Sequence, residues 1–263
     1  MATSILVEHA TKEFTLRYHR TIKQITVAAM RKQKISDTFL AVDDVSFSLE
    51  EGESVGLMGL NGSGKSTLLK LVNGTMKPDR GSVLTRGRIA GLIATGAGFH
   101  PQLTGRDNVY LNAAILGMSE AETNRKFDQI VEFADIGRFL ETPVGHYSSG
   151  MFSRLGFAVA VHTDSDIFLI DEVLAVGDKP FKKKCMARMQ EIRAEGRTML
   201  YVSHASGSVR KMCDRVLVLE KGVLGYDGPV DAGIRYLHYE EDDVDNAEES
   251  EEEDMDEELG ADV

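Results

Sequence analysis

The sequence predicts an α/β fold built around a largely parallel β-sheet. Short apolar runs alternate with helical segments, one apolar run leads directly into a glycine-rich turn, and 263 residues are enough for one large domain. Strands that alternate with helices form parallel sheets whose two faces are covered by those helices. We therefore expect a layered domain in which most strands are buried on both faces.

The predicted elements follow one another in a regular order. Early strands are expected at SILVEH (4–9), VDDVSFSL (42–49) and ESVGLMG (53–59), and a helix begins near Gly64. A helical block covers about 108–139, and a further helix begins near Gly150. The later strands are DIFLID (166–171), TMLYVSH (198–204) and a terminal hairpin formed by RVLVLEKG and VLGYDG (215–228).

The charge of the chain is concentrated near its C-terminal end. Of 42 acidic residues, 15 lie in 240–263, which has no lysine or arginine, so 1–239 carries +3 although the whole chain carries −12. Like charges repel, and too few apolar residues remain to form a core. We predict a disordered acidic tail over 240–263, either a solubilising end or a segment that docks on a basic patch.

The sequence predicts neither a membrane-spanning protein nor a secreted one. Even the longest apolar runs are short, such as 157–161, whereas a transmembrane helix needs about 20 apolar residues. The start, MATSILVEH, lacks the basic region, apolar core and cleavage site of a secretory signal. Cys185 and Cys213 do not form a disulfide framework, so a reducing cytoplasm is expected.

The segment GLNGSGKS at 59–66 matches the phosphate-binding pattern GxxxxGK[ST]. It follows an apolar strand and opens a helix, so its backbone N–H groups converge at the positive end of the helix dipole. Lys65 is expected to reach the β- and γ-phosphates of ATP, and Ser66 to hold Mg²⁺. A glycine turn without nucleotide is the alternative. The expected nucleotide-binding residues here are Gly59, Asn61, Gly62, Ser63, Gly64, Lys65, Ser66 and Thr67.

Two carboxylates follow a buried strand. Asp171 ends the apolar run IFLID, and a carboxylate at that strand end can hold Mg²⁺ near the phosphates. Glu172 is then placed to polarise the attacking water as a general base. A helix cap is the alternative for this pair of carboxylates.

Two further positions resemble the ATP-binding-cassette (ABC) ATPases. The string YSSGM at 147–151 stands where that family has its signature LSGGQ, and His204 stands where it has the switch histidine. YSSGM departs from LSGGQ at three of five positions but keeps Ser148 and Gly150, which touch phosphate in the family. For YSSGM alone, a serine and glycine helix cap is the alternative. The resemblance implies that Lys65, Glu172 and His204 are catalytic.

The same resemblance assigns further positions. Phe14, with Tyr18 as the alternative, falls where an aromatic ring stacks on adenine, and Asp178 falls where the D-loop aspartate lies. Counting back from LTGRDN places the family's Q-loop glutamine near Thr95, within IATGAGFH, where this chain has no glutamine. What replaces that glutamine is left open.

The strings GAGFHPQLTGRDN, YSSGM and IDEVLAVGD together resemble the ATP-binding subunits of bacterial polysaccharide exporters, which include the O-antigen, teichoic acid and cell-wall galactan exporters. This implies an ABC ATP-binding domain over 1–239. It has a RecA-like phosphate-loop ATPase core, an antiparallel β subdomain and a helical subdomain of about 98–157. Some exporters carry a C-terminal glycan-binding domain, whereas this sequence turns acidic soon after the predicted hairpin, so indirect handling of the polysaccharide is expected.

The resemblance also implies an assembly. Two ATPase subunits form a homodimer within a hetero-tetramer with an integral membrane permease, at the cytoplasmic face of the membrane. ATP hydrolysis in this assembly drives export of a lipid-linked polysaccharide, and no nucleic acid partner is expected. The alternative is an ABC ATPase without a membrane partner, acting in translation or DNA maintenance.

One segment, 17–38, interrupts the alternating pattern. It contains six basic residues and one acid, and apolar residues recur in it at helical spacing. A basic amphipathic helix could lie on an anionic membrane surface or a partner. An ordinary surface insertion is the alternative, and whether the segment contacts lipid or permease is left open.

The assignment of Glu172 is testable by the substitution Glu172→Gln, which removes the proton acceptor and leaves the expected Mg²⁺ and ATP contacts. ATP should still bind and the dimer should be more stable. Turnover should fall by about 10²-fold or more, the usual contribution of a general base. An ATPase assay with a parallel ATP-binding measurement checks this, and near-normal turnover would exclude the role.

Overall fold

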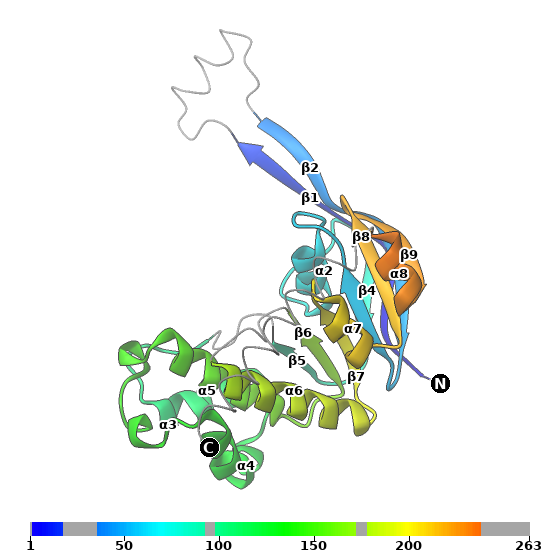
Figure 1. The fold of residues 1–263 in the computed structure, drawn as a ribbon. Coiled ribbons are helices and arrows are strands. Elements are labelled where there is room, and N and C mark those ends of the chain that lie inside the picture. The colour runs from blue at the N-terminus through cyan, green and yellow to red at the C-terminus, as the bar shows by residue number, and fades with distance from the viewer. Residues whose placement is uncertain (1, 18–35, 93–97, 172–177, 238–263) are drawn as a thin grey trace, which may run out of the picture.

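The computed structural model describes residues 2–17, 36–92, 98–171 and 178–237, which fold into two β-sheets and a group of helices (Figure 1). The larger sheet contains six strands in the order β5-β6-β7-β3-β8-β9. Its strands are β3 (Ser54–Met58), β5 (Ile89–Leu92), β6 (Ile167–Ile170), β7 (Thr198–Val202), β8 (Arg215–Glu220) and β9 (Val223–Pro229). The first five of these pair in parallel, and β9 returns antiparallel to β8.

The parallel strands are buried on both faces, as their near-continuous apolar sequences predict. In β6, Ile167 and Leu169 pack into one apolar core with the smaller sheet and α2 (Lys65–Val72). Their neighbours Phe168 and Ile170 pack into a second core with the other helices. The side chains of one strand therefore join two cores, because successive residues point to opposite faces.

The smaller sheet is antiparallel, in the order β2-β1-β4, with β1 (Thr3–Arg17), β2 (Ser36–Glu50) and β4 (Arg80–Thr85). Strands β1 and β2 remain paired as far as Arg17 and Ser36, well past the last β4 contact at Thr11. Beyond the sheet they form a two-stranded arm that projects from the body (Figure 1). The first strand is thus much longer than the SILVEH predicted from sequence, because pairing with β2 continues without β4.

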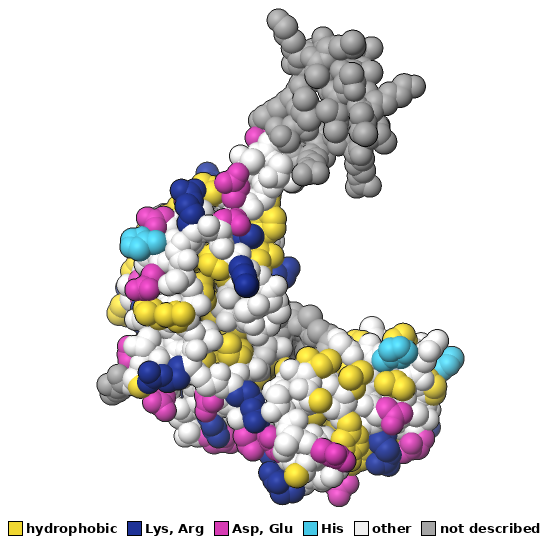
Figure 2. All heavy atoms as spheres, turned by 180° about the vertical axis from the view of Figure 1, so that it is seen from behind, with side chains coloured by type: hydrophobic (Ala, Val, Ile, Leu, Met, Phe, Trp, Pro, Cys, Tyr) yellow, Lys and Arg dark blue, Asp and Glu magenta, His cyan; other side chains and the backbone are white. Residues whose placement is uncertain are grey.

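The remaining helices cover the second face of the larger sheet and form a lobe beside it. They are α3 (Gly105–Ile115), α4 (Glu120–Ala134), α5 (Ser149–Val161), α6 (Lys179–Ala194), α7 (Ser206–Met212) and α8 (Val230–Tyr236), with short 3₁₀ turns at Gly137–Phe139 and Val144–His146. The lobe contains α3, α4 and part of α5 (Figure 1), and the surface is hollowed between it and the upper part of the body (Figure 2). Stacked and edge-to-face contacts join Phe133, Phe157 and Phe181, and so link α4, α5 and α6.

The predicted architecture is confirmed: a parallel α/β core, an antiparallel β part and a helical part. The terminal hairpin also forms as predicted. The expected helical block at 108–139 is instead two helices separated by a turn at 116–119, where Ser119 caps α4 through the Glu122 N–H. Strands β4 and β5 were not picked out from sequence, because one is half exposed and the other has only four residues.

Several sequence predictions fall outside the described residues. They include most of the basic insertion (18–35) and the acidic tail (240–263). Both ends of the insertion, Arg17 and 36–38, are paired strand. The limits of the ATP-binding domain and of its helical subdomain stay predictions. In the described part of the chain, no helix is both long and apolar enough to cross a bilayer.

Candidate functional site

A cavity of about 300 Å³ lies where the parallel strands β3, β6 and β7 end. The loop after β3 contributes most of the lining, Asp171 follows β6, and His204 comes two residues after β7. Because β6, β7 and β3 are neighbours, their carboxyl ends meet at one edge of the sheet. The lining consists of Phe39, Ala41, Asn61, Gly62, Ser63, Gly64, Lys65, Ser66, Thr67, Asp171, Val202 and His204.

The glycines of the loop have distinct structural reasons. Gly64 has φ of +106°, and a β-carbon there would overlap the backbone oxygen of Ala41. Gly59 has φ of +141°, and a β-carbon there would overlap the carbonyl of Leu219. Gly62 also has a positive φ, of +80°, but a β-carbon there would meet open space. The loop is therefore pressed against β2 and β8 at two points and is open at the third.

Lys65 is buried within the loop that it follows. Its side chain is 8% exposed, and its Nζ donates hydrogen bonds to the carbonyl oxygens of Gly59 at 2.6 Å and Leu60 at 3.0 Å. The ammonium group is thus held at the inner side of the loop. The hydroxyl of Ser63 is buried and has no hydrogen-bond partner within the described structure. A buried cation beside a loop of backbone N–H groups is a donor set that suits phosphate oxygens.

The lining also has the oxygen groups that suit a magnesium ion. Ser66 and Asp171 face the same cavity, whereas no cluster of three or more His, Cys, Asp or Glu side chains that could hold a metal occurs in the described ranges. Mg²⁺ is usually bound through one or two carboxylates, with substrate phosphates and water completing its shell. The site therefore fits Mg²⁺ bound together with a nucleotide.

An aromatic side chain that the sequence analysis did not single out enters the cavity. Phe39, on β2, lines it and is 47% exposed. The predicted adenine contact, Phe14, is not among the described lining residues; its ring stacks on Phe39 with centroids 5.6 Å apart. The two residues are cross-strand partners in the β1–β2 pair. The available signal was an aromatic residue just before VDDVSFSL, but sequence order alone does not show that β2 passes the loop.

The signature positions lie apart from this cavity. Ser148 is the N-cap of α5, where its Oγ accepts a hydrogen bond from the Met151 N–H at 3.2 Å. Ser148 and Gly150 are absent from the cavity lining within the ranges that the structure describes. The helix-cap alternative therefore describes the local structure of Ser148 correctly.

Asp178 also lies outside the described lining and is the N-cap of α6. It accepts hydrogen bonds from the Phe181 N–H at 3.3 Å and from Arg154 at 2.6 Å. Desolvation works to raise the pKa of Asp178, but these two donors lower it below its ordinary value. Asp178 therefore stays ionised and ties α5 to α6 through Arg154.

Three predicted positions are outside the described residues: Glu172, Thr95 and Tyr18. Their assignments as general base, Q-loop position and alternative adenine contact stay predictions.

Comparisons with known proteins agree with this geometry. Residues 42–175 match the family model described as "ABC transporter". The chain is 45% identical, over 81% of its length and 88% of the relative, to the O-antigen export system ATP-binding protein RfbB of Klebsiella pneumoniae. The chain belongs to the ABC transporter family. Members of this family are ATPases, and the chain shares that assignment.

Two further similarities refine the picture of this ABC protein. It is 43% identical, over 83% of its length, to the teichoic acids export ATP-binding protein TagH of Listeria innocua, but it spans only 64% of that relative. A solved ATP-binding subunit of an ABC transporter superposes with a TM-score of 0.70 at 25% identity, over 90% of this chain and 94% of that one. The relatives give no support to the alternative of an ATPase without a membrane partner.

The loop geometry predicts unequal effects for two neighbouring glycines. Gly64→Ala should abolish or severely weaken ATP binding, because the new methyl group collides with the Ala41 backbone and forces the loop to move. Gly62→Ala, the matched control, should cost only the backbone strain of about 1–2 kcal/mol for a left-handed residue. Calorimetric ATP titration of both variants checks this, and equal affinities would contradict it.

Proposed function

We propose that the chain is the ATP-hydrolysing subunit of an exporter of lipid-linked polysaccharide. It would sit at the cytoplasmic face of the membrane on an integral membrane permease. The observation that supports this most is the single cavity shared by the phosphate loop, Asp171 and His204. The substrate class rests on relatives named for the export of O-antigen and of teichoic acids.

In this proposal the loop binds the phosphates of ATP. Backbone N–H groups of 59–67 donate hydrogen bonds to the phosphate oxygens, and the Lys65 ammonium neutralises part of their charge. Lys65 is already buried beside the loop, where this contact would be made. Ser66 and Asp171 hold Mg²⁺, which neutralises charge on the phosphates when bound. Glu172 accepts the proton of the attacking water, and His204 orients the reacting end of the nucleotide from the neighbouring strand.

A second copy of the chain completes the site. Ser148 and Gly150 are the positions whose family counterparts touch phosphate, yet in one copy they lie apart from the described lining. Head-to-tail pairing would bring Ser148, Gly150 and Asp178 of one copy to the phosphate loop of the other. Closing and opening of this pair would move the permease. Hydrolysis therefore requires a homodimer, and the full transporter is a hetero-tetramer.

The aromatic contact to adenine is assigned to Phe39. Phe39→Ala should weaken ATP binding by about 5–150-fold, since stacking of one base on an aromatic ring contributes about 1–3 kcal/mol. Phe14→Ala should have a smaller effect, because that ring supports Phe39 from outside the cavity. The ATP affinity of both variants is measured. The affinity for inorganic triphosphate, which has no base to stack, should be unchanged in both. A larger loss for Phe14→Ala would overturn the assignment.

The export function is tested in cells that depend on this chain. Lys65→Ala should stop ATP hydrolysis and leave lipid-linked polysaccharide on the inner side of the membrane. Lys70→Ala is the matched control, because Lys70 is an exposed lysine later in the same helix. Surface polysaccharide is measured by labelling intact cells, and the internal lipid-linked pool by extraction. Normal surface polysaccharide in the Lys65→Ala cells would contradict the proposal.

A further inference from the structure

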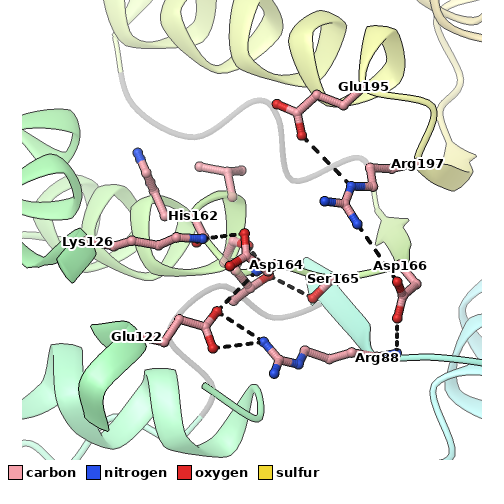
Figure 3. A network of polar contacts seen from close by, with 12 residues as sticks. Arg88, Glu122, Lys126, His162, Asp164, Ser165, Asp166, Glu195 and Arg197 are labelled. Carbon is pink, nitrogen blue, oxygen red and sulfur yellow. Dashed lines mark hydrogen bonds and ion pairs between the residues drawn. The ribbon is translucent and has the colours of Figure 1, made fainter. Parts of the chain in front are cut away.

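A network of polar contacts joins the helical lobe to the sheet at the end of α5 that lies farthest from Ser148 (Figure 3). The segment 162–166 connects α5 to β6, since His162 is the C-cap of α5 and β6 begins at Ile167. We call this segment the linker. It joins the helix that begins with the signature serine to the strand that leads to Asp171.

Glu122 of α4 is at the centre of the network. Its side chain is only 8% exposed, and Arg88 donates from Nη1 to both carboxylate oxygens, each at 3.1 Å. The same carboxylate accepts a long hydrogen bond from the Asp164 N–H, at 3.4 Å. A buried carboxylate is costly unless it is paired. Glu122 thus holds together a side chain that precedes β5 and the backbone of the linker.

Lys126 forms a second connection, one turn later on α4. Its Nζ donates to the carbonyl oxygen of His162 at 2.8 Å and to Asp164 at 2.5 Å. This hydrogen bond lowers the pKa of Asp164, so the carboxylate is ionised at neutral pH. Glu122 and Lys126 of α4 therefore contact two positions of the linker, His162 and Asp164.

The backbone of Arg88 is itself fixed to the last residue of the linker and the first residue of β6. Its N–H donates to the Asp166 carboxylate at 2.7 Å, and its carbonyl accepts from the N–H groups of Asp166 and Ile167 at 2.9 and 3.1 Å. Residue 87 must be glycine here, because φ is +103° and a β-carbon would overlap the Asp166 carboxylate. Arg88 is therefore a firm attachment point on the sheet for the carboxylate of Glu122.

Because the network lies at one end of α5 and Ser148 at the other, a small change of angle at the network would displace Ser148. Helix α5 has 13 residues and is about 20 Å long at 1.5 Å per residue. A tilt of about 10° at the linker would move the far end of a helix of that length by about 3–4 Å. A displacement of even about 1 Å of a group that contacts reacting atoms can reduce the rate about 100-fold.

We propose that Glu122 is a positioning residue. By joining Arg88 to the linker it sets the angle between α5 and the sheet, and so the place of Ser148 relative to the phosphate loop of a second copy. The second half of this inference rests on the proposed function, in which ATP lies between two copies. The first half, the angle of the lobe, is a property of a single chain.

The test uses the full chain with Glu122→Gln, which keeps the size of the side chain and removes its charge. Lys126→Met, which cuts the other connection from a less buried position, is the second variant. The matched control is Glu141→Gln, because Glu141 pairs with Arg106 at 2.8 Å within the lobe and has no recorded bond to the linker in the described structure.

The readout is the distance between spin labels on introduced cysteines at Gln129 of α4 and Leu84 of β4, both exposed. The native Cys185 and Cys213 do not compete for the label, because burial raises the pKa of each thiol to about 12. ATP affinity, kcat for ATP hydrolysis and the urea midpoint are measured on the same proteins.

The expected result is a broadened or shifted distance distribution in Glu122→Gln and Lys126→Met, with unchanged ATP affinity. The kcat of both should fall about 10-fold or more, given the sensitivity of rates to placement. Glu141→Gln should match the unmodified chain. Unchanged distances in both variants would overturn the proposal, as would a lowered urea midpoint with distances and kcat intact. An unmodified chain without ATPase activity would refute the proposed function instead, and the distances would still decide the role of Glu122.

Discussion

The hydrogen-bonded register of β6, β7 and β3 places three chemically different groups at one edge of the sheet. Parallel pairing sets Leu57 beside Val202 and Ile170 beside Tyr201, so the loops after these strands leave the sheet at the same level. The phosphate loop follows β3, Asp171 follows β6 and His204 follows β7. An antiparallel β7 would send His204 to the opposite edge. The cavity is thus a consequence of strand direction, which the crossover connections between these parallel strands make possible.

The phosphate loop depends on contacts from outside its own segment. Ala41 on β2 and Leu219 on β8 press against the two glycines whose backbone leaves no room for a side chain. The smaller sheet therefore shapes the loop as well as covering the core. It also supplies Phe39 on β2, so the smaller sheet forms part of the cavity lining. The long pairing of β1 with β2 is what holds Phe39 in this place.

The helical lobe is attached to the sheet by two kinds of contact. Aromatic rings of α4, α5 and α6 pack together and provide apolar burial without strict directionality. The Arg88–Glu122 pair and the Lys126 bonds are directional and meet at the linker. Charge-assisted hydrogen bonds depend on geometry more strictly than apolar packing does, which is why we propose that these bonds set the angle of the lobe. This division suits a lobe whose far end, in the proposed function, meets a second copy.

Much of the site could be predicted from the sequence because its signals are local. The loop 59–66 has its glycines, lysine and serine in one short run, and the apolar run before Asp171 identifies a buried strand and its end. The same holds for the parallel sheet, since strand and helix patterns recur along the chain. The sequence also shows that YSSGM departs from the family signature but keeps its serine. The structure places that serine, Ser148, as the N-cap of α5.

Only the tertiary structure decided the features that depend on pairing between distant segments. It selected Phe39 over Phe14 for the cavity, because β2 runs beside the phosphate loop, where Ala41 contacts Gly64, and no local pattern shows which strand lies there. It extended β1 into an arm, because its pairing with β2 continues without β4. It also joined Arg88, Glu122 and Asp164, which are ordinary charged residues in sequence and form a network around the buried Glu122 only when β5, α4 and the linker meet. Side-chain identity specifies local backbone preference, and long-range packing decides which of those side chains share a site.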